Sequence, residues 1–563
     1  MQLVTKSRFL VQPEASSHRS RRKLSSELAS ESCTSINKFL VRLIRGKSWK
    51  SLLQRGQDFP RGVLVCAVAA LCGCAVGPDY YLSGVEVPVS YGSSWTTAVT
   101  QDDLTQPEIL RWWRTLRDRE LDRLVERAIE CNPDIEIALT RVQAFRTQEI
   151  VVIGNALPQV GASGTVAAGT GTDLTKGRVA QSIRAGDATT GLQHIDRMAG
   201  FDAQWELDLF GKYRRLLEAV RDDAQAMFEL RNAVLISVVA DVASSYVDIR
   251  ALQLRLRIAQ KAVDAAQKNV TFTQSRFERG LTNELDATLA KRELATLQAV
   301  LPQLKSAISV DESRLSVLLG AYSPEIIPEL RSSARLPRVP SRPRAGAPAD
   351  LLRRRPDIRQ AERVLAAATA RIGVATADLF PAVTFTAGFG VQGGEPTGGS
   401  TKPIGNPIWS AGPGGYWPLL DFGRLDALID IQELQAHAML VAYKKTILVA
   451  VEEVDDAIKL LRAQQQRLRE LSVALEQSKR AVTLATDRYE TGLTDFLNVL
   501  DAERQEFAIE DQEAVAEEAV VLQYISLYKA LGGGWELYDE LPPLKEAQPA
   551  LLASARRLTN DWH

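Results

Sequence analysis

The strongest constraint on the fold of this chain is an internal duplication. Residues 276–286, RFERGLTNELD, return as RYETGLTDFLN at residues 488–498, which is 212 positions later. Two dipeptides repeat at the same offset, Phe-Gly at 210 and 422 and Leu-Gly at 319 and 531. Upstream, NPDIEIALTRVQA from residue 132 matches RPDIRQAERVLAA from residue 355, an offset of 223. We therefore expect a tandem repeat of a unit of roughly 220 residues.

The two copies share one order of predicted elements. Each begins with a helix that opens on Pro-Asp, because Pro suits the first helical position and Asp complements the helix dipole. This helix is expected to end at Leu157-Pro158 in the first copy and at Phe380-Pro381 in the second. A segment rich in Gly and Thr follows. The copy then continues with a very long helix, a Gly-Leu-Thr turn and a return helix that ends at Leu-Gly.

The long helices are expected to be far longer than a typical domain is wide. Gly211 precedes Gly280 by 69 residues, Gly423 precedes Gly492 by 69 residues, and neither interval contains Pro. A continuous helix of this length spans about 100 Å. In the second interval apolar residues recur at spacings of 3, 4 and 7, which is typical of supercoiled helices. They are Leu440, Ile447, Val451, Val454, Ile458, Leu461, Leu468, Leu471, Leu475 and Val482. A plain coiled-coil rod is the alternative, but such rods lack paired strands.

Two alternating segments indicate strands that separate an apolar face from a polar one. Residues 383–392 (VTFTAGFGVQ) and 201–209 (FDAQWELDL) alternate with a period of two. A soluble sandwich would show the same period. We favour outer-membrane strands because each copy offers only two segments of about ten residues, and because aromatic residues cluster near the predicted strand ends. These are Trp205, Trp409, Tyr416 and Trp417; the segments 169–193 and 393–407 read as polar, Gly- and Pro-rich loops.

Four strands per chain cannot close a barrel, and open sheet edges are not tolerated in hydrocarbon. The chain is therefore expected to associate with copies of itself. Three copies give 12 strands, enough for an aqueous lumen when judged between the ~8-strand filled barrels and the ~16-strand porins. Polar residues such as Asp202, Glu206 and Asp208 would line that water. The strand arithmetic alone leaves two or four copies open.

The N-terminus has the pattern of an exported lipoprotein. Residues 1–73 carry 13 Lys and Arg against 4 Asp and Glu. An apolar core from about Val63 follows Arg61 and ends in LCGC at residues 71–74, which resembles a bacterial lipobox. Cys74 would then receive diacylglycerol, and its N-acyl and diacylglycerol chains would hold the protein at a bilayer. Ala75 in place of Asp implies sorting to the outer membrane. An ordinary signal core that happens to contain Cys is the alternative.

Acylation of Cys74 would leave Cys131 as the only Cys of the mature chain, so no intrachain disulfide is expected. Two interpretations stay open for residues 1–60, which are long for such a leader: a translation start set too early, or a genuine extension.

Several motifs together resemble the TolC-like outer-membrane efflux proteins, specifically the lipoprotein branch of NodT-type factors that serve RND drug pumps. The resemblance covers about residues 74–540. Its motifs are CAVGPDY at 74–80, Trp112-Trp113, WELDLFG at 205–211, LLRRRPDI at 351–358 with Ala361-Glu362, and LGGGW at 531–535.

The resemblance implies a fold that is mainly α with a small β part. In this family, three tandem-duplicated protomers form a 12-stranded outer-membrane β-barrel, with four strands per chain, continued by a long periplasmic α-helical barrel. The implied function is a passive exit duct for small molecules. An inner-membrane RND pump would supply the energy, and a periplasmic adaptor protein would join pump to duct. The homotrimer would lie in the cell outer membrane, anchored by lipid, and extend into the periplasm.

The resemblance also assigns residues to two sites. The adaptor would dock at the turns Gly280-Leu281-Thr282 and Gly492-Leu493-Thr494, where Gly permits a sharp reversal. The closed periplasmic aperture would be formed by Leu497, Asp501 and Arg504. The chemistry fits, since Leu497 narrows the pore and the two charged residues are three apart on one helix face. The first copy has Leu289 where the second has Asp501, whereas Arg292 matches Arg504. The alternative for the docking site is a pair of turns that bind no partner. The alternative for the aperture is a charge pair exposed to solvent.

We place the domain boundaries as follows: a leader at 1–73, a lipid-anchored linker at 74–104, the first efflux repeat at 105–333, the second at 334–540, and a tail at 541–563.

Two other functions were weighed. A type I secretion duct for polypeptides would share the architecture, but the lipobox and the RRPDI segment favour small-molecule efflux. An anchored periplasmic enzyme is disfavoured because the sequence lacks Gly-x-Ser-x-Gly, P-loop and His-Glu-x-x-His motifs and its four His are scattered. No metal, other cofactor or nucleic-acid partner is expected. The sequence does not specify the cargo, because the pump selects it.

Overall fold

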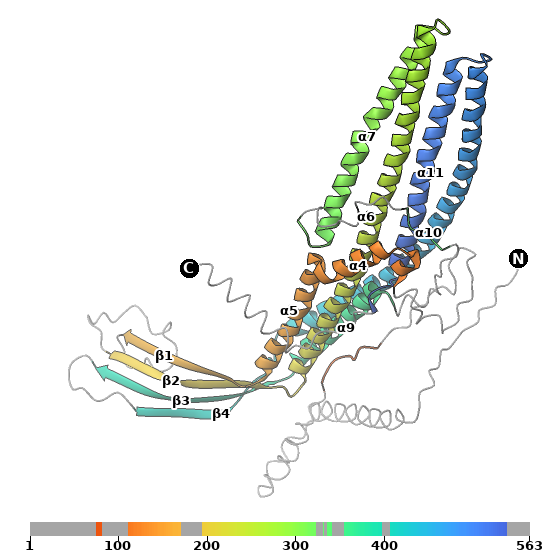
Figure 1. Ribbon diagram of the computed structural model, residues 1–563. Coiled ribbons are helices and arrows are strands. Elements are labelled where there is room, and N and C mark those ends of the chain that lie inside the picture. Colours follow the sequence, from red (N-terminus) through yellow and green to blue (C-terminus); the bar gives the residue numbers. More distant parts are fainter. Residues whose placement is uncertain are drawn as a thin grey trace, which may run out of the picture.

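The structure, a computed structural model, describes residues 75–81, 111–169, 194–322, 330, 335–340, 354–396 and 406–536 (Figure 1). The predicted leader, Cys74, most of the 74–104 linker and the 541–563 tail lie outside these ranges. A small sheet lies at one end of the molecule, the turns of two long helical hairpins lie at the other, and shorter helices flank the middle.

The element order repeats as predicted. The first copy contains α5 (Pro133–Ala156), β1 (Gln159–Gly169), β2 (His194–Leu207), α6 (Lys212–Glu278) and α7 (Glu284–Leu318), and is preceded by η2 (Trp112–Leu116) and α4 (Arg119–Cys131). The second contains α9 (Pro356–Ala377), β3 (Ala382–Pro396), β4 (Asn406–Tyr416), α10 (Arg424–Glu490) and α11 (Phe496–Ala530). α6 and α10 each have 67 residues, and α7 and α11 each have 35. The duplication is therefore confirmed element by element.

The apolar stripe predicted along the second long helix is confirmed. All ten of its residues are buried or half-buried in α10, which packs along α11 to form one hairpin, as α6 packs along α7 to form the other. Burial of such a stripe is what stabilises a helix of this length, since propensity alone contributes little. No helix in the described ranges is both long enough and apolar enough to pass through a bilayer.

The four strands form one antiparallel sheet in the order β1-β2-β3-β4. Its register aligns Phe201 of β2, Phe389 of β3 and Trp409 of β4 in one row. The next row holds Asp202, Gly388 and Ser410. Because neighbouring rows face opposite ways, one face of the sheet carries large aromatic side chains and the other carries small and polar ones.

The sequence prediction differs from the sheet at three points. The predicted loop 393–407 is shorter, because β3 continues to Pro396 and β4 begins at Asn406. β2 ends at Leu207, so the predicted alternation to residue 209 overruns the strand. Trp409 lies opposite Phe389 within the sheet, whereas Trp205, Tyr416 and Trp417 lie near the end that joins the helices. Alternation continues through turns and cannot fix where pairing stops.

The main core lies where the shorter helices meet the hairpins. Trp112 stacks on Tyr528 of α11 with ring centroids 5.9 Å apart, and Thr115 Oγ1 lies 2.7 Å from the Tyr524 hydroxyl. Tyr246 of α6 donates to Asp118 Oδ2 at 2.7 Å. The first two contacts tie η2 to α11 at the end of the second copy, and the third ties the start of α4 to α6.

Four helix ends share one hydrogen-bond pattern. At the end of α6, Leu281 N–H donates to Arg276 O at 2.9 Å and Gly280 N–H donates to Phe277 O at 2.8 Å. The same pair of bonds closes α7 at Gly320, α10 at Gly492 and α11 at Gly532, each with φ between +66° and +77°. This is the Schellman motif, which favours Gly because its φ is positive.

The four glycines predict unequal effects of substitution. A Cβ at Gly320 would lie 2.3 Å from Cys131 O, whereas a Cβ at Gly492 would meet nothing within 4 Å. We expect Gly492→Ala to cost about 1 kcal/mol from φ alone and Gly320→Ala to cost roughly 3 kcal/mol because backbone must also shift. Thermal melts followed by circular dichroism would compare them. Equal melting temperatures for the two variants would contradict this account.

Candidate functional site

The two predicted docking turns lie together at the end of the molecule opposite the sheet (Figure 1). Leu281 and Leu493, the middle residues of the turns, have exposed fractions of 63% and 70%. Thr282 donates to the Asp286 carboxylate, and Asn498 Nδ2 donates to Thr494 Oγ1 at 2.7 Å. Each threonine thus stabilises the first turn of the return helix and leaves the preceding leucine in solvent.

An aromatic cluster, which the sequence analysis missed, joins the two hairpins just behind the turns. Tyr489 of α10 packs against Phe496 of α11 and Phe272 of α6. The Arg276 guanidinium lies 5.0 Å from the Tyr489 ring centroid and 5.6 Å from that of Phe272. Cation–π contacts of this kind contribute about 0.5–1 kcal/mol each. The signal in the sequence was the repeated Arg-Phe and Arg-Tyr before each turn.

The three predicted aperture residues lie on α11 beyond the second turn. Leu497 has an exposed fraction of 57%, and Asp501 is also exposed. Arg504 does not face Asp501 closely: its guanidinium donates to Glu293 of α7, with Nε 2.7 Å from Oε2. Glu293 is buried. Within this chain the charged partner of Arg504 therefore comes from the first copy, which the Asp501–Arg504 spacing did not reveal.

The boundary between the two hairpins combines apolar and polar contacts. Apolar side chains of both hairpins are buried together in the main core and again just behind the turns. Between these regions Arg255 of α6 binds Asp511 of α11 through two hydrogen bonds of 2.7 and 3.0 Å, and nearer the turns Asn269 donates to Glu503 at 2.6 Å. Beside the Glu293–Arg504 pair a groove of about 390 Å³ separates α6 and α7 from α10 and α11. These polar contacts form a seam that lies between two apolar clusters.

A pair of carboxyl groups belongs to this polar seam. Asp248 of α6 and Glu518 of α11 lie close enough to affect each other's protonation, and a hydrogen bond between them would require one proton because two ionised carboxylates only accept. Burial, followed by the charge of Asp311 on α7, raises the pKa of Asp248 to about 6. Burial, followed by the charge of Asp248, raises the pKa of Glu518 to about 7, against the opposing effect of Arg255. Arg314 of α7 opposes the shift of Asp248.

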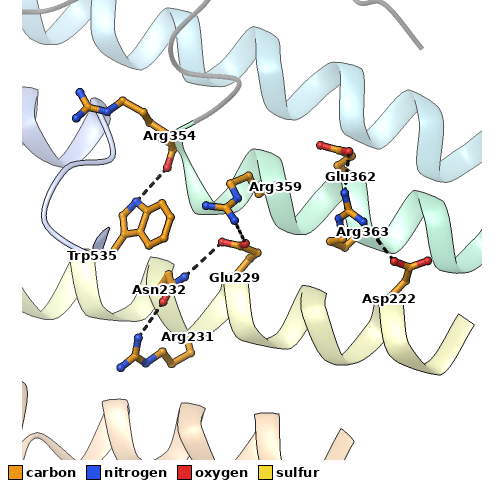
Figure 2. A network of polar contacts seen from close by, with 9 residues as sticks. All are labelled: Asp222, Glu229, Arg231, Asn232, Arg354, Arg359, Glu362, Arg363 and Trp535. Carbon is orange, nitrogen blue, oxygen red and sulfur yellow. Dashed lines mark hydrogen bonds and ion pairs between the residues drawn. The ribbon is translucent and has the colours of Figure 1, made fainter. Parts of the chain in front are cut away.

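Ion pairs also fasten α9 of the second copy to α6 of the first (Figure 2). Arg359 binds Glu229 at 2.6 Å, and Arg363 binds Asp222 at 3.4 Å. Trp535, from the closing LGGGW motif, donates to Arg354 O at 3.0 Å, and the Arg359 guanidinium lies 4.8 Å from its ring centroid. The RRPDI and LGGGW motifs therefore lie in contact with each other, although they are far apart in the sequence.

Two hydrogen bonds of the first copy recur at the equivalent positions of the second copy. Asn132 Nδ2 donates to Leu318 O, and Arg355 Nη1 donates to Ala530 O, both at 2.8 Å. Trp205 Nε1 donates to Ala156 O, and Trp417 Nε1 donates to Leu379 O, both at 3.0 Å. The donors and acceptors differ by the offsets 223 and 212 that relate the copies in the sequence. The two tryptophans thus fix both short helices to the base of the sheet.

The residues that the structure describes include no group of three or more His, Cys, Asp or Glu suited to hold a metal ion.

Comparisons with known proteins agree with this geometry. A family model described as outer membrane efflux protein matches residues 124–321 and 347–533. Nodulation protein T of Rhizobium leguminosarum bv. viciae is 29% identical over 86% of this chain and 95% of its own length. Cation efflux system protein CusC of Escherichia coli O6:H1 is 30% identical, over 84% and 98%. The solved structure of the outer-membrane channel OprN has a TM-score of 0.71 and 33% identity, covering 82% of this chain and all of its own.

The carboxyl pair predicts that stability falls as pH rises. A carboxyl whose pKa is higher in the folded than in the unfolded protein binds its proton more tightly when folded. Its contribution to stability is therefore present at low pH and is lost as the pH rises. For this pair the loss runs from about pH 4 to about pH 7. Glu518→Gln keeps a donor for Asp248 and should reduce the pH slope, with a gain of roughly 2 kcal/mol at pH 8.

Denaturation midpoints at pH 5, 6, 7 and 8 would measure this slope. Glu476→Gln, at an exposed position on α10, is the matched control. An unchanged slope in Glu518→Gln would show that the pair does not titrate in this range.

Proposed function

The chain belongs to the outer membrane efflux protein family, and from that premise we propose that three copies of it form the passive exit duct of a tripartite efflux system. The channel function itself follows from the family and from relatives such as CusC and OprN. The number of copies, the lipid anchor, the partners and the aperture are argued below from this chain's own residues.

The observation that carries the assembly is that the strand pairing and the helix packing between the two copies have unused counterparts. Within the described chain β2 pairs with β3, whereas β1 and β4 each pair on one side only. α6 of the first copy packs on α9 and α11 of the second. Because the copies are equivalent, the same contacts can form from the second copy of one subunit to the first copy of the next: β4 with β1, and α10 with α5 and α7. Repeating this step closes a ring.

The surfaces that this ring would bury are apolar in the single chain. On α5, Ile137, Ile150 and Val151 have exposed fractions of about one half. On the half of α10 nearer the sheet the exposed apolar residues include Leu428, Ile431, Leu434, Val441 and Leu448. Apolar patches of this extent mark interaction surfaces in soluble regions of proteins. Three subunits would give the 12 strands that the family resemblance implies, enough for an aqueous lumen.

In such a barrel the aromatic face of the sheet would face lipid and the small, polar face would face water. Phe201, Phe389 and Trp409 have exposed fractions above 60% in the single chain, as residues awaiting a lipid environment would. The row of Asp202, Gly388 and Ser410 would line the lumen. Cys74, immediately before the described segment 75–81, would carry the acyl chains that anchor each subunit to outer-membrane lipid.

For its partners we propose a periplasmic adaptor that docks at the turns bearing Leu281 and Leu493, and an inner-membrane RND pump. The name of the relative CusC denotes cation efflux, which supports small-molecule export in place of the polypeptide secretion of a type I duct. The exact domain boundaries at 104, 333 and 540 remain part of this proposal.

For the aperture we propose Leu497, Asp501 and Arg504, with Glu293 as the residue that holds Arg504. The exposed Leu497 would project into the narrow end of the duct. The Glu293–Arg504 pair joins the two hairpins beside the groove. Opening of the narrow end would therefore require this ion pair to break.

Breaking the aperture contacts should open the channel. In planar bilayers, the purified wild-type trimer is expected to conduct rarely, whereas Asp501→Ala with Arg504→Ala should raise mean conductance at least about tenfold, as expected if about 1.4 kcal/mol or more of closing energy is lost. Glu293→Gln should give a smaller rise, since the amide still accepts from Arg504. Arg292→Ala, at the matching position of the first copy, is the control. Silent bilayers from folded double-variant trimer would argue against the duct.

Substitution of the exposed leucines of the turns should weaken binding of the adaptor without affecting assembly of the trimer. Leu281→Ser with Leu493→Ser is expected to lower export of a fluorescent pump substrate several-fold in cells that also express the adaptor and pump, because apolar contact area is lost. Trimer yield in the outer membrane should not change, since both side chains point into solvent. Normal export by the double variant would place the docking surface elsewhere.

A further inference from the structure

The seven described residues nearest the N-terminus, Ala75–Tyr81, lie against the junction between the sheet and the long helices. Val76 N–H donates to Phe210 O at 3.1 Å, next to the start of α6. Tyr80 is half-buried and packs against the main core, and burial raises its pKa to about 12. We refer to residues 75–81 as the strap.

One buried arginine binds the strap at three points. Arg215 of α6 donates to Val76 O at 3.0 Å, to Gly77 O at 3.2 Å and to the Asp79 carboxylate at 2.6 Å. Its side chain is only 6% exposed, and its remaining acidic partner is Glu218. Burial of a charge is costly unless it is paired. The three hydrogen bonds from the strap therefore offset much of the free-energy cost of burying the Arg215 guanidinium.

Three glycines leave room for the strap. A Cβ at Gly77 would lie 2.3 Å from the Cα of Gly373 in α9, and a Cβ at Gly373 would lie 2.9 Å from Val76 O. A Cβ at Gly211 would lie 2.6 Å from the Cα of Ala75. The backbone of the strap therefore touches the backbones of both copies, where no side chain fits.

The duplication shows that the fold itself does not require this arrangement. At the offsets of the repeat, Ala427 stands at the position of Arg215 and Ile150 at that of Gly373. Gly423, the counterpart of Gly211 with a similar φ of +82°, has nothing within 4 Å of a built Cβ. One of two equivalent junctions has thus acquired an Arg and a Gly that accommodate the strap, and the other has neither.

We propose that the strap is a fixed mount for the lipid anchor: Arg215 locks residues 75–81 in place, so that the N-terminal end of the strap, Ala75, lies at the junction of sheet and helices. The acyl chains would then enter the membrane beside β2 and β3 of the same subunit, and would not trail on a free tether. The part that concerns lipid rests on the acylation of Cys74 proposed above; the locking by Arg215 does not.

Hydrogen exchange measured by mass spectrometry on the purified, detergent-solubilised trimer tests the lock. Peptides covering 75–81 should be protected in the wild type and should exchange at least about tenfold faster in Arg215→Gln, which loses charge-assisted hydrogen bonds. Asp79→Asn removes the charge of one acceptor while its amide oxygen still accepts from Arg215, and should give a smaller increase, which keeps the test valid if Arg215→Gln folds poorly. The control is Arg221→Ala. Arg221 lies on α6, as Arg215 does, and forms an exposed ion pair with Glu149 of α5. Equal exchange in wild type and both strap variants would overturn the proposal.

A second version of the protein separates the lock from the anchor. Exported behind a non-lipoprotein signal so that it begins at Ala75, the chain carries no acyl group, and the strap should still be protected. Loss of protection in this version would mean that the membrane, and not Arg215, holds the segment. Independently, the mass of the N-terminal peptide from the natural protein reports acylation. Absence of the acyl groups there would refute the proposed anchor while leaving the lock in place.

The position of the anchor is tested with a fatty acid that carries a photoactivatable diazirine and is incorporated at Cys74 in growing cells. Crosslinks within the chain should concentrate on 201–207 and 382–389 in the wild type and should scatter in Asp79→Asn and Arg215→Gln. An identical pattern in all three proteins would show that the strap does not place the lipid.

Discussion

The structure depends on one constraint, which is that backbone hydrogen-bond groups cannot remain unpaired in hydrocarbon. Each chain offers four strands, and the first and last of them pair on one side only within the described residues. The contacts between the two copies of the repeat show how this is resolved. The same strand pairing and helix packing that join copy one to copy two inside a chain can join copy two to copy one of the next chain. The duplication thus turns an open sheet into a segment of a closed ring.

The packing within a helical hairpin differs from the contacts between the two hairpins. In the second hairpin, the apolar residues of α10 at heptad spacing are buried or half-buried. Between the hairpins, apolar clusters lie in the main core and behind the turns, and polar contacts lie between these clusters: Arg255 with Asp511, Asn269 with Glu503, and Glu293 with Arg504. Polar contacts exposed at one side to water contribute little net free energy when made and can be exchanged for water.

Near the sheet the opposite holds, because contacts there are tight and specific. Trp205 and Trp417 bind the ends of the short helices, the arginines of α9 bind the acids of α6, and Arg215 binds the strap. Among the residues of the family motifs, Trp205 and Val76 lie near the sheet, whereas Trp112, Ile358 and Trp535 belong to the main core.

The sequence by itself determined the duplication, the element order, the long helices and the two alternating strands, because these features are periodic and local: heptads, period-two alternation, Pro at helix starts and Gly at helix ends. Only the tertiary structure decided which distant groups meet. Spacing places Asp501 and Arg504 on one helix face, but it does not show that within the chain Arg504 binds Glu293, 211 residues away, and nothing near Arg215 in the sequence pointed to Val76 or Asp79. Pairing across packed helices depends on their relative rotation and shift, which a single helix's periodicity does not encode.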